Sequence, residues 1–174
     1  SGTALESIEV TSQSETPAVV GDGAIDMMVE RIVDAQSVGV DTVSGATITS
    51  QGIIDAVTDA AQQAAKAAAL EAALDGACTV PLAILEACGE GIALAAEYAE
   101  KGSVLAVSDA GCAALFCKAA LQAASLNVFI NTRLMADKAH AAALNAKADA
   151  MLAEFVPIAD TVYDKLSHQL RGES

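Results

Sequence analysis

The feature that most constrains the fold is a long helical pattern from Gln51 through an Ala-rich tract to about Leu74. Apolar residues make up 53% of the chain, largely as Ala, and only 3% of the residues are aromatic. Alanine has the highest helix propensity, and small side chains let helix axes approach closely. This pattern predicts a mainly α protein made of closely packed helices.

Further helices are predicted on both sides of this tract. Between Ala24 and Ala35 the apolar residues have the spacing of one buried helical stripe: Ile25, Met28, Val29, Ile32 and Val33. Asp75-Gly76 is a predicted helix stop. Three more helices are expected after it, namely Pro81 to Lys101 with Thr79 as its cap, Ser108 to about Ser125, and about Leu134 to Leu170 with a kink or break at Pro157.

The N-terminal part has a different pattern. Residues 5–13 are predicted to form a short strand that includes Ser7 to Val10, and Glu15-Thr-Pro17 turns the chain. The predicted fold class is therefore mainly α, with a small α+β N-terminal segment followed by an all-helical bundle.

A hydroxyl-rich loop lies directly ahead of the long helical run. Residues 41–50 read Asp-Thr-Val-Ser-Gly-Ala-Thr-Ile-Thr-Ser. Unpaired N–H groups and the helix dipole at such a junction favour a phosphate, and Gly45 lets the backbone approach it closely. The alternative is a plain capping loop, with Thr49 or Ser50 as N-cap and Asp55 in the first turn.

Several motifs in order resemble a known family over roughly residues 5–60. They are Glu15-Thr-Pro17, Gln36-Ser37, Val40-Asp-Thr-Val-Ser-Gly-Ala-Thr47 and a helix beginning Ile53-Ile-Asp-Ala-Val57. This segment resembles the FMN-binding domain of flavinylated electron carriers, such as subunits of the sodium-pumping quinone reductase and the urocanate and fumarate reductases.

The resemblance implies a covalent cofactor. Thr47 would carry FMN through a phosphoester bond made by a separate flavin transferase, and a redox partner would exchange electrons with it. The recognition context carried over from the family is Asp41, Ser44, Gly45 and Ala46. No aromatic residue precedes Tyr98, so the flavin ring is expected to rest on apolar side chains, namely Met27, Met28, Val43 or Ile48.

The charge of the chain limits its partners. The net charge is −14; residues 1–63 hold ten acidic residues and one basic residue, and residues 64–174 hold thirteen and eight. Binding to nucleic acid or anionic lipid needs a basic face, so neither is expected. No membrane span is predicted either, because no uninterrupted apolar run reaches the roughly 18 residues of a spanning helix.

Cysteine and histidine residues show no metal-ligand spacing. Cys78, Cys88, Cys112 and Cys117 form no Cys-x-x-Cys pair, so we expect small buried hydrophobes and neither a disulfide nor a zinc site. His140 and His168 lie in polar-flanked helical sequence and are expected at the surface.

The second half of the chain carries its own motifs, over roughly residues 65–170. They are Ala77-Cys-Thr-Val-Pro-Leu82, Ala99-Glu-Lys-Gly-Ser103, Val107-Ser-Asp-Ala-Gly-Cys-Ala-Ala114 and Ala124-Ser-Leu-Asn-Val-Phe-Ile-Asn131. These resemble the C-terminal half of the formimino-tetrahydrofolate cyclodeaminase and methenyl-tetrahydrofolate cyclohydrolase family, which implies an all-helical, dimeric fold that binds folate between helices.

Four residues of these motifs become site candidates through that resemblance. Ser108 and Asp109 are the catalytic candidates, and Asn127 and Asn131 are the candidates for binding folate. Each also has a structural interpretation, because Ser108-Asp109 suits a helix N-cap and asparagines suit a turn between helices.

Two domains are therefore expected: a truncated FMN-binding-type domain at 1–63 and a partial helical domain at 64–174. We rank an FMN-carrying electron-transfer module first, because its attachment motif is local and intact. The alternatives are a tetrahydrofolate one-carbon enzyme and a non-catalytic helical assembly module. The flavin function would place the chain outside the cytoplasm, and the folate function would place it inside. Helices that are apolar nearly all round predict a homo-oligomer, either a dimer or a tetramer.

Overall fold

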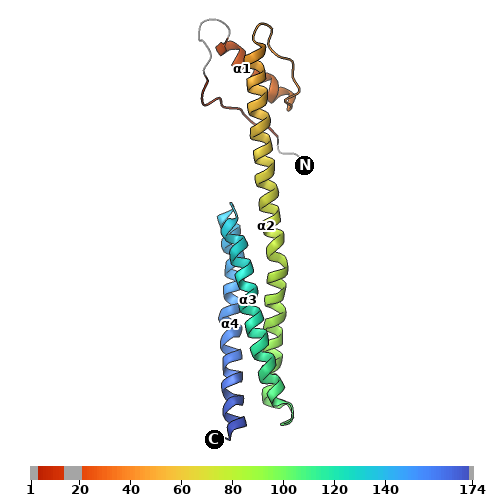
Figure 1. Ribbon diagram of the computed structural model, residues 1–174, viewed down its shortest axis with the longest axis vertical. Coiled ribbons are helices and arrows are strands. Elements are labelled where there is room, and N and C mark those ends of the chain that lie inside the picture. Colours follow the sequence, from red (N-terminus) through yellow and green to blue (C-terminus); the bar gives the residue numbers. More distant parts are fainter. Residues whose placement is uncertain (1–3, 14–20, 173–174) are drawn as a thin grey trace. The chain divides into compact units, whose positions relative to one another are not determined.

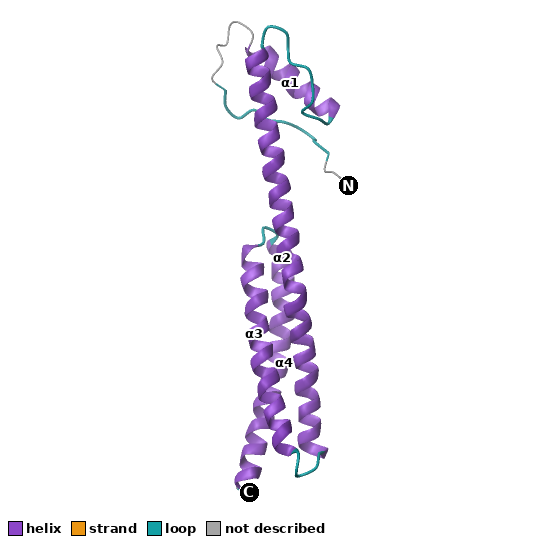
Figure 2. Ribbon diagram, turned by 45° about the vertical axis from the view of Figure 1, so that its right-hand side comes forward, coloured by secondary structure: helices purple, strands orange, loops and turns teal. Residues whose placement is uncertain are grey.

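The structure is a computed structural model that describes residues 4–13 and 21–172. Within those ranges all regular structure is helical, with α1 at Gly21–Ala35, α2 at Thr47–Lys101, α3 at Val107–Leu134 and α4 at Lys138–Arg171 (Figures 1 and 2). The prediction of a mainly α fold is confirmed. The chain divides into two compact units, residues 1–68 and residues 69–174, which are described separately.

The predicted α+β character of the N-terminal segment is wrong for the described residues. Residues 5–13 are extended but belong to no strand. A strand needs a second backbone to pair with, and here the backbone of Leu5 pairs with a side chain instead. The Leu5 N–H donates to Gln36 Oε1 and the Leu5 carbonyl accepts from Gln36 Nε2, both at 2.8 Å. The predicted turn at Glu15-Thr-Pro17 lies outside the described residues.

Helix α1 confirms its predicted apolar stripe. Ile25, Met28 and Ile32 are buried, and Val29 and Val33 are half-buried. The core of this unit forms where the stripe meets the loop before α2 and the first turns of α2. Its buried members are Ala24, Met28, Ile32, Val43, Ala46 and Val57.

Helix α2 passes without a break through the predicted helix stop and the predicted new start. Asp75-Gly76 does not end it, Thr79 does not cap a new helix, and Pro81 lies inside it. Gly and Pro in a helix interior cost about 1 and 3 kcal/mol relative to Ala. Packing offsets this cost, because one buried stripe continues on both sides of Pro81 through Leu74, Cys78, Leu85 and Ile92.

In the second unit, residues 69–101 of α2 pack with α3 and α4 around one core. Glycines allow close helix contacts here: a Cβ on Gly89 would lie 2.5 Å from the Phe155 ring, and one on Gly91 would lie 2.8 Å from Cys117 Sγ. Ion pairs tie α4 to its neighbours at the surface, between Lys118 and Asp160, Lys165 and Glu100, and His140 and Asp75.

Helix α3 is longer than predicted and begins differently. It starts at Val107 and extends to Leu134, past the predicted end at Ser125. Ser108 is not its N-cap, because the helix has already begun one residue earlier and the cap residue Ala106 makes no side-chain bond. Asp109 does lie in the first turn, as predicted.

Helix α4 begins later than predicted and is not divided. Its N-cap is Asp137, whose carboxylate accepts the N–H of His140 at 2.9 Å. Pro157 lies inside the continuous helix. Glu71 of α2 accepts the N–H groups of Ala136 and Asp137 at 2.8 and 3.0 Å, which fixes the turn between α3 and α4.

The cysteines are all free, and only some are buried as predicted. Cys78 is buried, Cys88 and Cys117 are half-buried, and Cys112 is exposed, which corrects the prediction for that residue. Burial raises the pKa of the Cys78 and Cys88 thiols, so both stay protonated at neutral pH. His140 and His168 are exposed, as predicted.

Candidate functional site

The loop before α2 is held by one buried hydroxyl. Ser50 is fully buried; its Oγ accepts the Val43 N–H at 3.0 Å and donates to the Ala46 carbonyl at 2.8 Å. A tight turn closes from the Ala46 N–H to the Val43 carbonyl at 3.0 Å, and Gly45 within it has φ +82°. Gly45 suits this left-handed position because it lacks a Cβ.

This arrangement corrects the expected capping role of Thr49 and Ser50. Helix α2 begins at Thr47, two residues before Thr49. The first helical bond in this region runs from the Ser50 N–H to the Ala46 carbonyl at 2.9 Å. The Ser50 side chain therefore joins two parts of the loop and does not cap the helix. Asp55 lies beyond the first turn, which holds no acidic residue.

Thr47 is the first residue of α2, and it is exposed. In the preceding loop Asp41, Ser44 and Gly45 are exposed too, whereas Ala46 is buried. The N–H groups of the first three residues of a helix have no acceptor within it. Those of α2 belong to Thr47, Ile48 and Thr49. The hydroxyl of Thr47 thus stands at a helix end that favours negative charge.

The other end of the loop is held by a guanidinium group. Arg31 Nη1 donates to the Asp41 carbonyl at 2.9 Å and to the Thr42 carbonyl at 3.4 Å. Arg31 is the one basic residue within residues 1–63, so it is the nearest positive side chain in the sequence for a phosphate on this loop.

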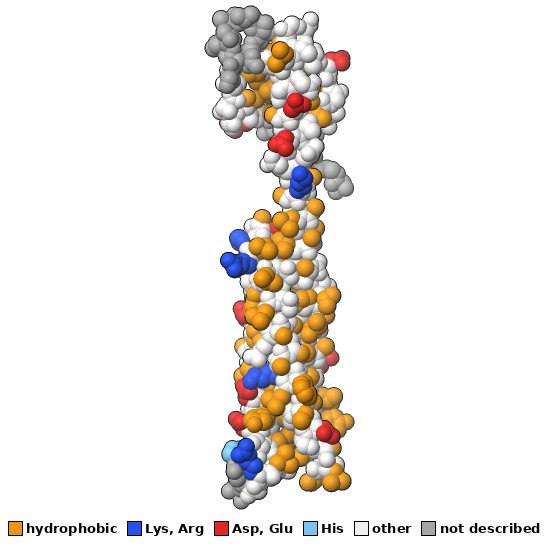
Figure 3. Space-filling model, in the orientation of Figure 1, with side chains coloured by type: hydrophobic (Ala, Val, Ile, Leu, Met, Phe, Trp, Pro, Cys, Tyr) orange, Lys and Arg blue, Asp and Glu red, His pale blue; other side chains and the backbone are white. Residues whose placement is uncertain are grey.

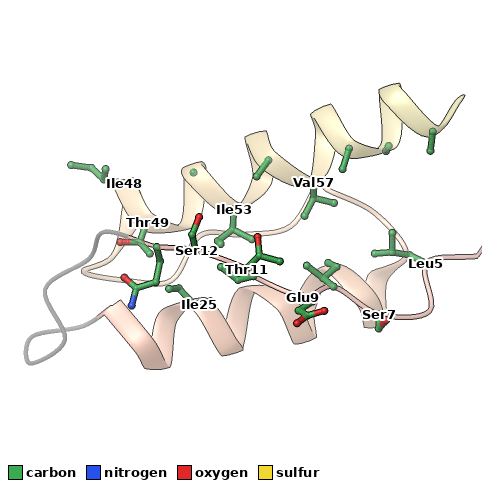
Figure 4. Close-up of a pocket in the computed structure, with 18 residues that line it drawn as sticks. Leu5, Ser7, Glu9, Thr11, Ser12, Ile25, Ile48, Thr49, Ile53 and Val57 are labelled. Atoms are coloured by element: carbon green, nitrogen blue, oxygen red, sulfur yellow. The ribbon is translucent and has the colours of Figure 1, made fainter. Parts of the chain in front are cut away.

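A groove of about 790 Å³ lies next to Thr47 in the same unit. It is lined by Leu5, residues 7–13, Ile25 of α1 and the first turns of α2. Figure 4 shows Ile25, Ile53 and Thr11 gathered in the middle, with Ile48 at one end and Leu5 at the other. Its lining is apolar with interspersed hydroxyls, and its volume is in the range of small-molecule sites.

The residues that line the groove differ from the apolar residues that were expected to contact a flavin ring. Met28 and Val43 belong to the buried core, and Met27 does not line the groove. Ile48 does line it. The residues that sequence reasoning missed are Ile8, Ile25, Ile53 and Val57. On α2 a signal was available, because the lining residues recur every three or four positions: Thr49, Gly52, Ile53, Ala56, Val57, Ala60, Ala61 and Ala64.

The folate candidates lie far apart in one chain. Ser108 and Asp109 are exposed in the first turn of α3, and Asn127 and Asn131 lie in the last turns of the same helix. At 1.5 Å per residue, Asp109 and Asn127 are about 27 Å apart along the helix. The chain does not bring the four residues together.

Asn127 and Asn131 lie inside α3 and not in a turn, which corrects the structural interpretation. The Asn127 side-chain amide donates to the Ala123 carbonyl at 3.1 Å. The Asn131 amide donates to the Asn127 carbonyl at 2.8 Å and to the Ala77 carbonyl of α2 at 3.5 Å. Asn131 therefore also supports the packing of α3 on α2.

Two further features of the described residues bear on function. Those residues contain no group of three or more His, Cys, Asp or Glu side chains that could hold a metal ion. Two helices, α2 and α3, are long and apolar enough to cross a membrane by length and composition alone. Core helices of water-soluble proteins pass the same test.

Comparisons with known proteins support both resemblances. Residues 52–150 match the family model for formiminotransferase-cyclodeaminase, and residues 1–62 match that for the FMN-binding domain. A methenyltetrahydrofolate cyclohydrolase from Methylorubrum extorquens is 37% identical over 94 residues, which are 54% of this chain and 45% of that relative. The chain thus spans about half the length of the curated relative it matches.

Proposed function

The chain belongs to the formiminotransferase-cyclodeaminase family, and we propose that its residues 1–62 make it a carrier of FMN attached to Thr47 by a phosphoester bond. Electrons would pass between this flavin and a redox partner. A separate flavin transferase would attach the flavin. We place the domain boundary at 63/64, close to the division of the two compact units at 68/69, with the flavin on the N-terminal side.

The observation that carries this proposal is the position of Thr47. Its hydroxyl is exposed, it begins α2, and the preceding turn contains Gly45, around which a Cβ would meet no atom within 4 Å. A transferase can therefore approach the hydroxyl from solvent. The unpaired N–H groups of the first helical turn favour the phosphate once it is attached.

The residues of the loop have separate tasks in the attachment. Thr47 Oγ1 would form the new bond to the FMN-side phosphorus of a flavin dinucleotide held by the transferase, while the pyrophosphate bond of that donor breaks and AMP leaves. The Thr47 hydroxyl releases its proton, so that the chain gains FMN less one water. Ser44, Gly45 and Ala46 present this hydroxyl in a fixed turn, and Asp41 offers an exposed carboxylate for the transferase to recognise.

The groove beside Thr47 fits the flavin ring in size and polarity. Ile25, Ile48 and Ile53 supply apolar contact, and the hydroxyls of Thr11 and Ser12 supply hydrogen-bonding groups. No aromatic side chain is among the described residues that line the groove, so stacking on them does not contribute. The covalent bond is then what retains the cofactor, and the bound flavin would supply the electron transfer itself.

Intact mass and the visible spectrum test this proposal. Protein made together with a flavin transferase and flavin should gain the mass of one FMN less one water and become yellow. Thr47→Ala should abolish the adduct. Thr58→Ala is the matched control, because Thr58 lies on the same helix with its hydroxyl bonded to the Ile54 carbonyl. An adduct of full yield in Thr47→Ala would refute the assignment.

A second candidate function is a tetrahydrofolate one-carbon enzyme. The observation in its favour is the match of residues 52–150, together with the name of the Methylorubrum extorquens relative. Asp109 would act as the acid–base group at the one-carbon bridge, with Ser108 beside it. Asn127 and Asn131 would bind the folate.

Hydrolysis of methenyl-tetrahydrofolate, followed by absorbance, separates the two candidates. We expect a rate close to that of buffer for a single chain, because the candidate residues are spread along α3. A rate well above buffer that Asp109→Ala abolishes would place the folate function first.

A further inference from the structure

Gln36, the residue directly after α1, has a backbone conformation that few side chains favour. Its φ is +49°, in the left-handed region. Glycine or asparagine usually occupies this position after a helix, because the Cβ of other residues is strained there. Among the described residues, Gln36 is the only one other than glycine with a positive φ. Strain of this kind persists where the surrounding contacts hold the residue in place, and it is common at functional sites.

The side-chain amide of Gln36 is fully engaged in hydrogen bonds. Its Oε1 accepts the Leu5 N–H, and its Nε2 donates to the Leu5 carbonyl, both at 2.8 Å. The second proton of Nε2 is donated to the Val33 carbonyl of α1 at 2.7 Å. The amide therefore bonds to Leu5 as the opposite residue of an antiparallel pair would, and it ties Leu5 to the last turn of α1.

Leu5 begins the extended segment that forms one wall of the groove beside Thr47. We call residues 5–13 the wall segment, because Leu5 and residues 7–13 line the groove. Figure 4 shows this segment from Leu5 to Ser12 along the groove. Within the described part of the chain, no backbone–backbone hydrogen bond joins the wall segment to α1 or α2. Leu5 and Ile8 also pack against the core of this unit.

Packing gives the wall segment little support on its other side. A second hollow, of about 430 Å³, lies on the α1 side of the segment. Ile8 and Val10 of the segment and Asp26 and Val29 of α1 are among its lining residues. The wall segment thus borders open space on two sides, without the close packing that fixes most interior segments. Its position therefore depends on the hydrogen bonds at Leu5.

We propose that Gln36 is a positioning residue of the flavin site, which fixes the wall segment against the flavin ring by holding Leu5. The inference rests on the proposed function. It also accounts for the strain, because glycine would suit the left-handed backbone of Gln36 better but would leave Leu5 without a partner. The groove then keeps its second wall, and water is excluded from one side of the ring.

The wall segment also brings a negative charge to the groove. Glu9 belongs to the segment, lines the groove and is exposed. Figure 3 shows further acidic side chains on the visible face of the N-terminal unit. A flavin gains negative charge when it is reduced, and both a nearby carboxylate and the exclusion of water disfavour that charge. A wall segment held in place should therefore lower the reduction potential of the flavin.

NMR of the full chain without flavin tests whether Gln36 holds the wall segment. In the wild type, the methyl groups of Leu5 and Ile8 should show nuclear Overhauser effects to the core. Gln36→Asn keeps an amide and suits the left-handed backbone, but it is one methylene shorter. It should weaken these effects by about half or more, because the segment then opens locally. Gln63→Asn is the matched control, since the Gln63 amide bonds only within α2, to Asp59.

The flavin on Thr47 provides the readouts that a merely structural role of Gln36 would not change. Gln36→Asn should increase the quenching of flavin fluorescence by iodide about twofold or more, as expected for an opened segment, and should raise the reduction potential. Gln36→Gly should do the same, although it removes the strain. Glu9→Gln should raise the potential and leave the Leu5 contacts unchanged. Circular dichroism checks that all variants keep their helices.

The outcomes separate this proposal from the proposed function. Equal Leu5 contacts in Gln36→Asn and wild type would refute the hold on the wall segment. Weakened contacts with unchanged quenching and potential would mean that Gln36 supports the fold and does not position the wall segment at the flavin. If the wild type gains no flavin on Thr47, the proposed function is wrong and the role of Gln36 toward flavin falls with it, whereas the Leu5 contacts still report on the hold itself.

Discussion

The side-chain amide of Asn131 on α3 donates to the carbonyl of Ala77 on α2, across 3.5 Å. Pro81 has no N–H, so the Ala77 carbonyl four residues earlier has no donor within its own helix. A residue 54 positions away in the sequence thus satisfies the acceptor that the proline leaves open. This contact explains in part how α2 continues through Pro81.

Asn131→Ala should therefore destabilise the protein by about 1 kcal/mol, the lower end of the cost of an unsatisfied acceptor, because the bond is long. In a Pro81→Ala background the same change should cost less, since the helix then supplies the donor. Urea unfolding of the four proteins measures this coupling.

Asn127→Ala is the control for this cycle. The Asn127 amide bonds only within α3, to Ala123, so its removal should show no coupling to Pro81→Ala. Equal costs of Asn131→Ala in both backgrounds would contradict the proposed compensation.

Alanine substitution at two glycines of α2 should change the stability of the protein in opposite directions. A Cβ at Gly89 would lie 2.5 Å from the Phe155 ring, so Gly89→Ala should destabilise the protein by about 1–3 kcal/mol through overpacking. Around Gly76 a Cβ would meet no atom within 4 Å, and Gly76→Ala should stabilise the helix by about 0.5–1 kcal/mol. Thermal unfolding of both variants checks the signs. Destabilisation by both would show that the close contact at Gly89 is not the cause.

The stability of the helical unit should depend on pH through His140. Its Nε2 lies 2.6 Å from Asp75 Oδ1, and this hydrogen bond raises the pKa of His140, with burial opposing and the charges of Asp75, Asp137 and Glu71 adding to the rise. A raised pKa in the folded state means that the contribution is fully present below the unfolded pKa of 6.5 and is lost as pH rises through the folded pKa.

Asp75→Asn separates this contribution from others. It should lower the pKa of His140, measured by NMR titration, and should destabilise the protein more at pH values below the His140 pKa than above it. Both groups are exposed, so salt should weaken the effect. A His140 pKa that is the same in both proteins would contradict the assignment of its cause.

The sequence predicts those elements whose signals are local. The stripe of α1 at Ile25, Met28 and Ile32 needs only its own spacing, and the loop ahead of α2 is marked by Gly45 and its hydroxyls. Gly76 and Pro81 are equally strong local signals, yet they gave wrong helix ends. Their outcome depends on tertiary contacts such as Asn131 with Ala77, which no local pattern contains.

The same reason explains the error in the N-terminal segment. The alternation in residues 5–13 indicates an extended chain, and the chain is extended there. An extended segment becomes a strand only if a second backbone pairs with it. Here the backbone of Leu5 bonds to the side-chain amide of Gln36. For the candidate site, the register of α2 decided which residues line the groove. The helical pattern in the sequence begins at Gln51, so it does not predict that Thr47 is the first residue of α2.

Ser50 does not line the groove, yet its substitution should affect the attachment of flavin. Ser50 is fully buried and joins the Val43 N–H to the Ala46 carbonyl, which fixes the turn that presents Thr47. Ser50→Ala leaves a buried N–H without a partner and should cost about 1–3 kcal/mol. With the turn loosened, flavin transfer to Thr47 should slow as well, measured as the yield of the FMN adduct over time.

Ser44→Ala is the matched control for Ser50→Ala. Ser44 is exposed in the same loop, so its substitution should leave the unfolding temperature unchanged and weaken flavin transfer only through recognition by the transferase. If Ser50 supports the turn, Ser50→Ala should lose stability and slow the transfer of flavin. If Ser44 serves only in recognition by the transferase, Ser44→Ala should slow the transfer without loss of stability. Transfer at the wild-type rate in Ser50→Ala would mean that the transferase shapes the loop itself, so that the fixed turn is not what makes Thr47 the acceptor.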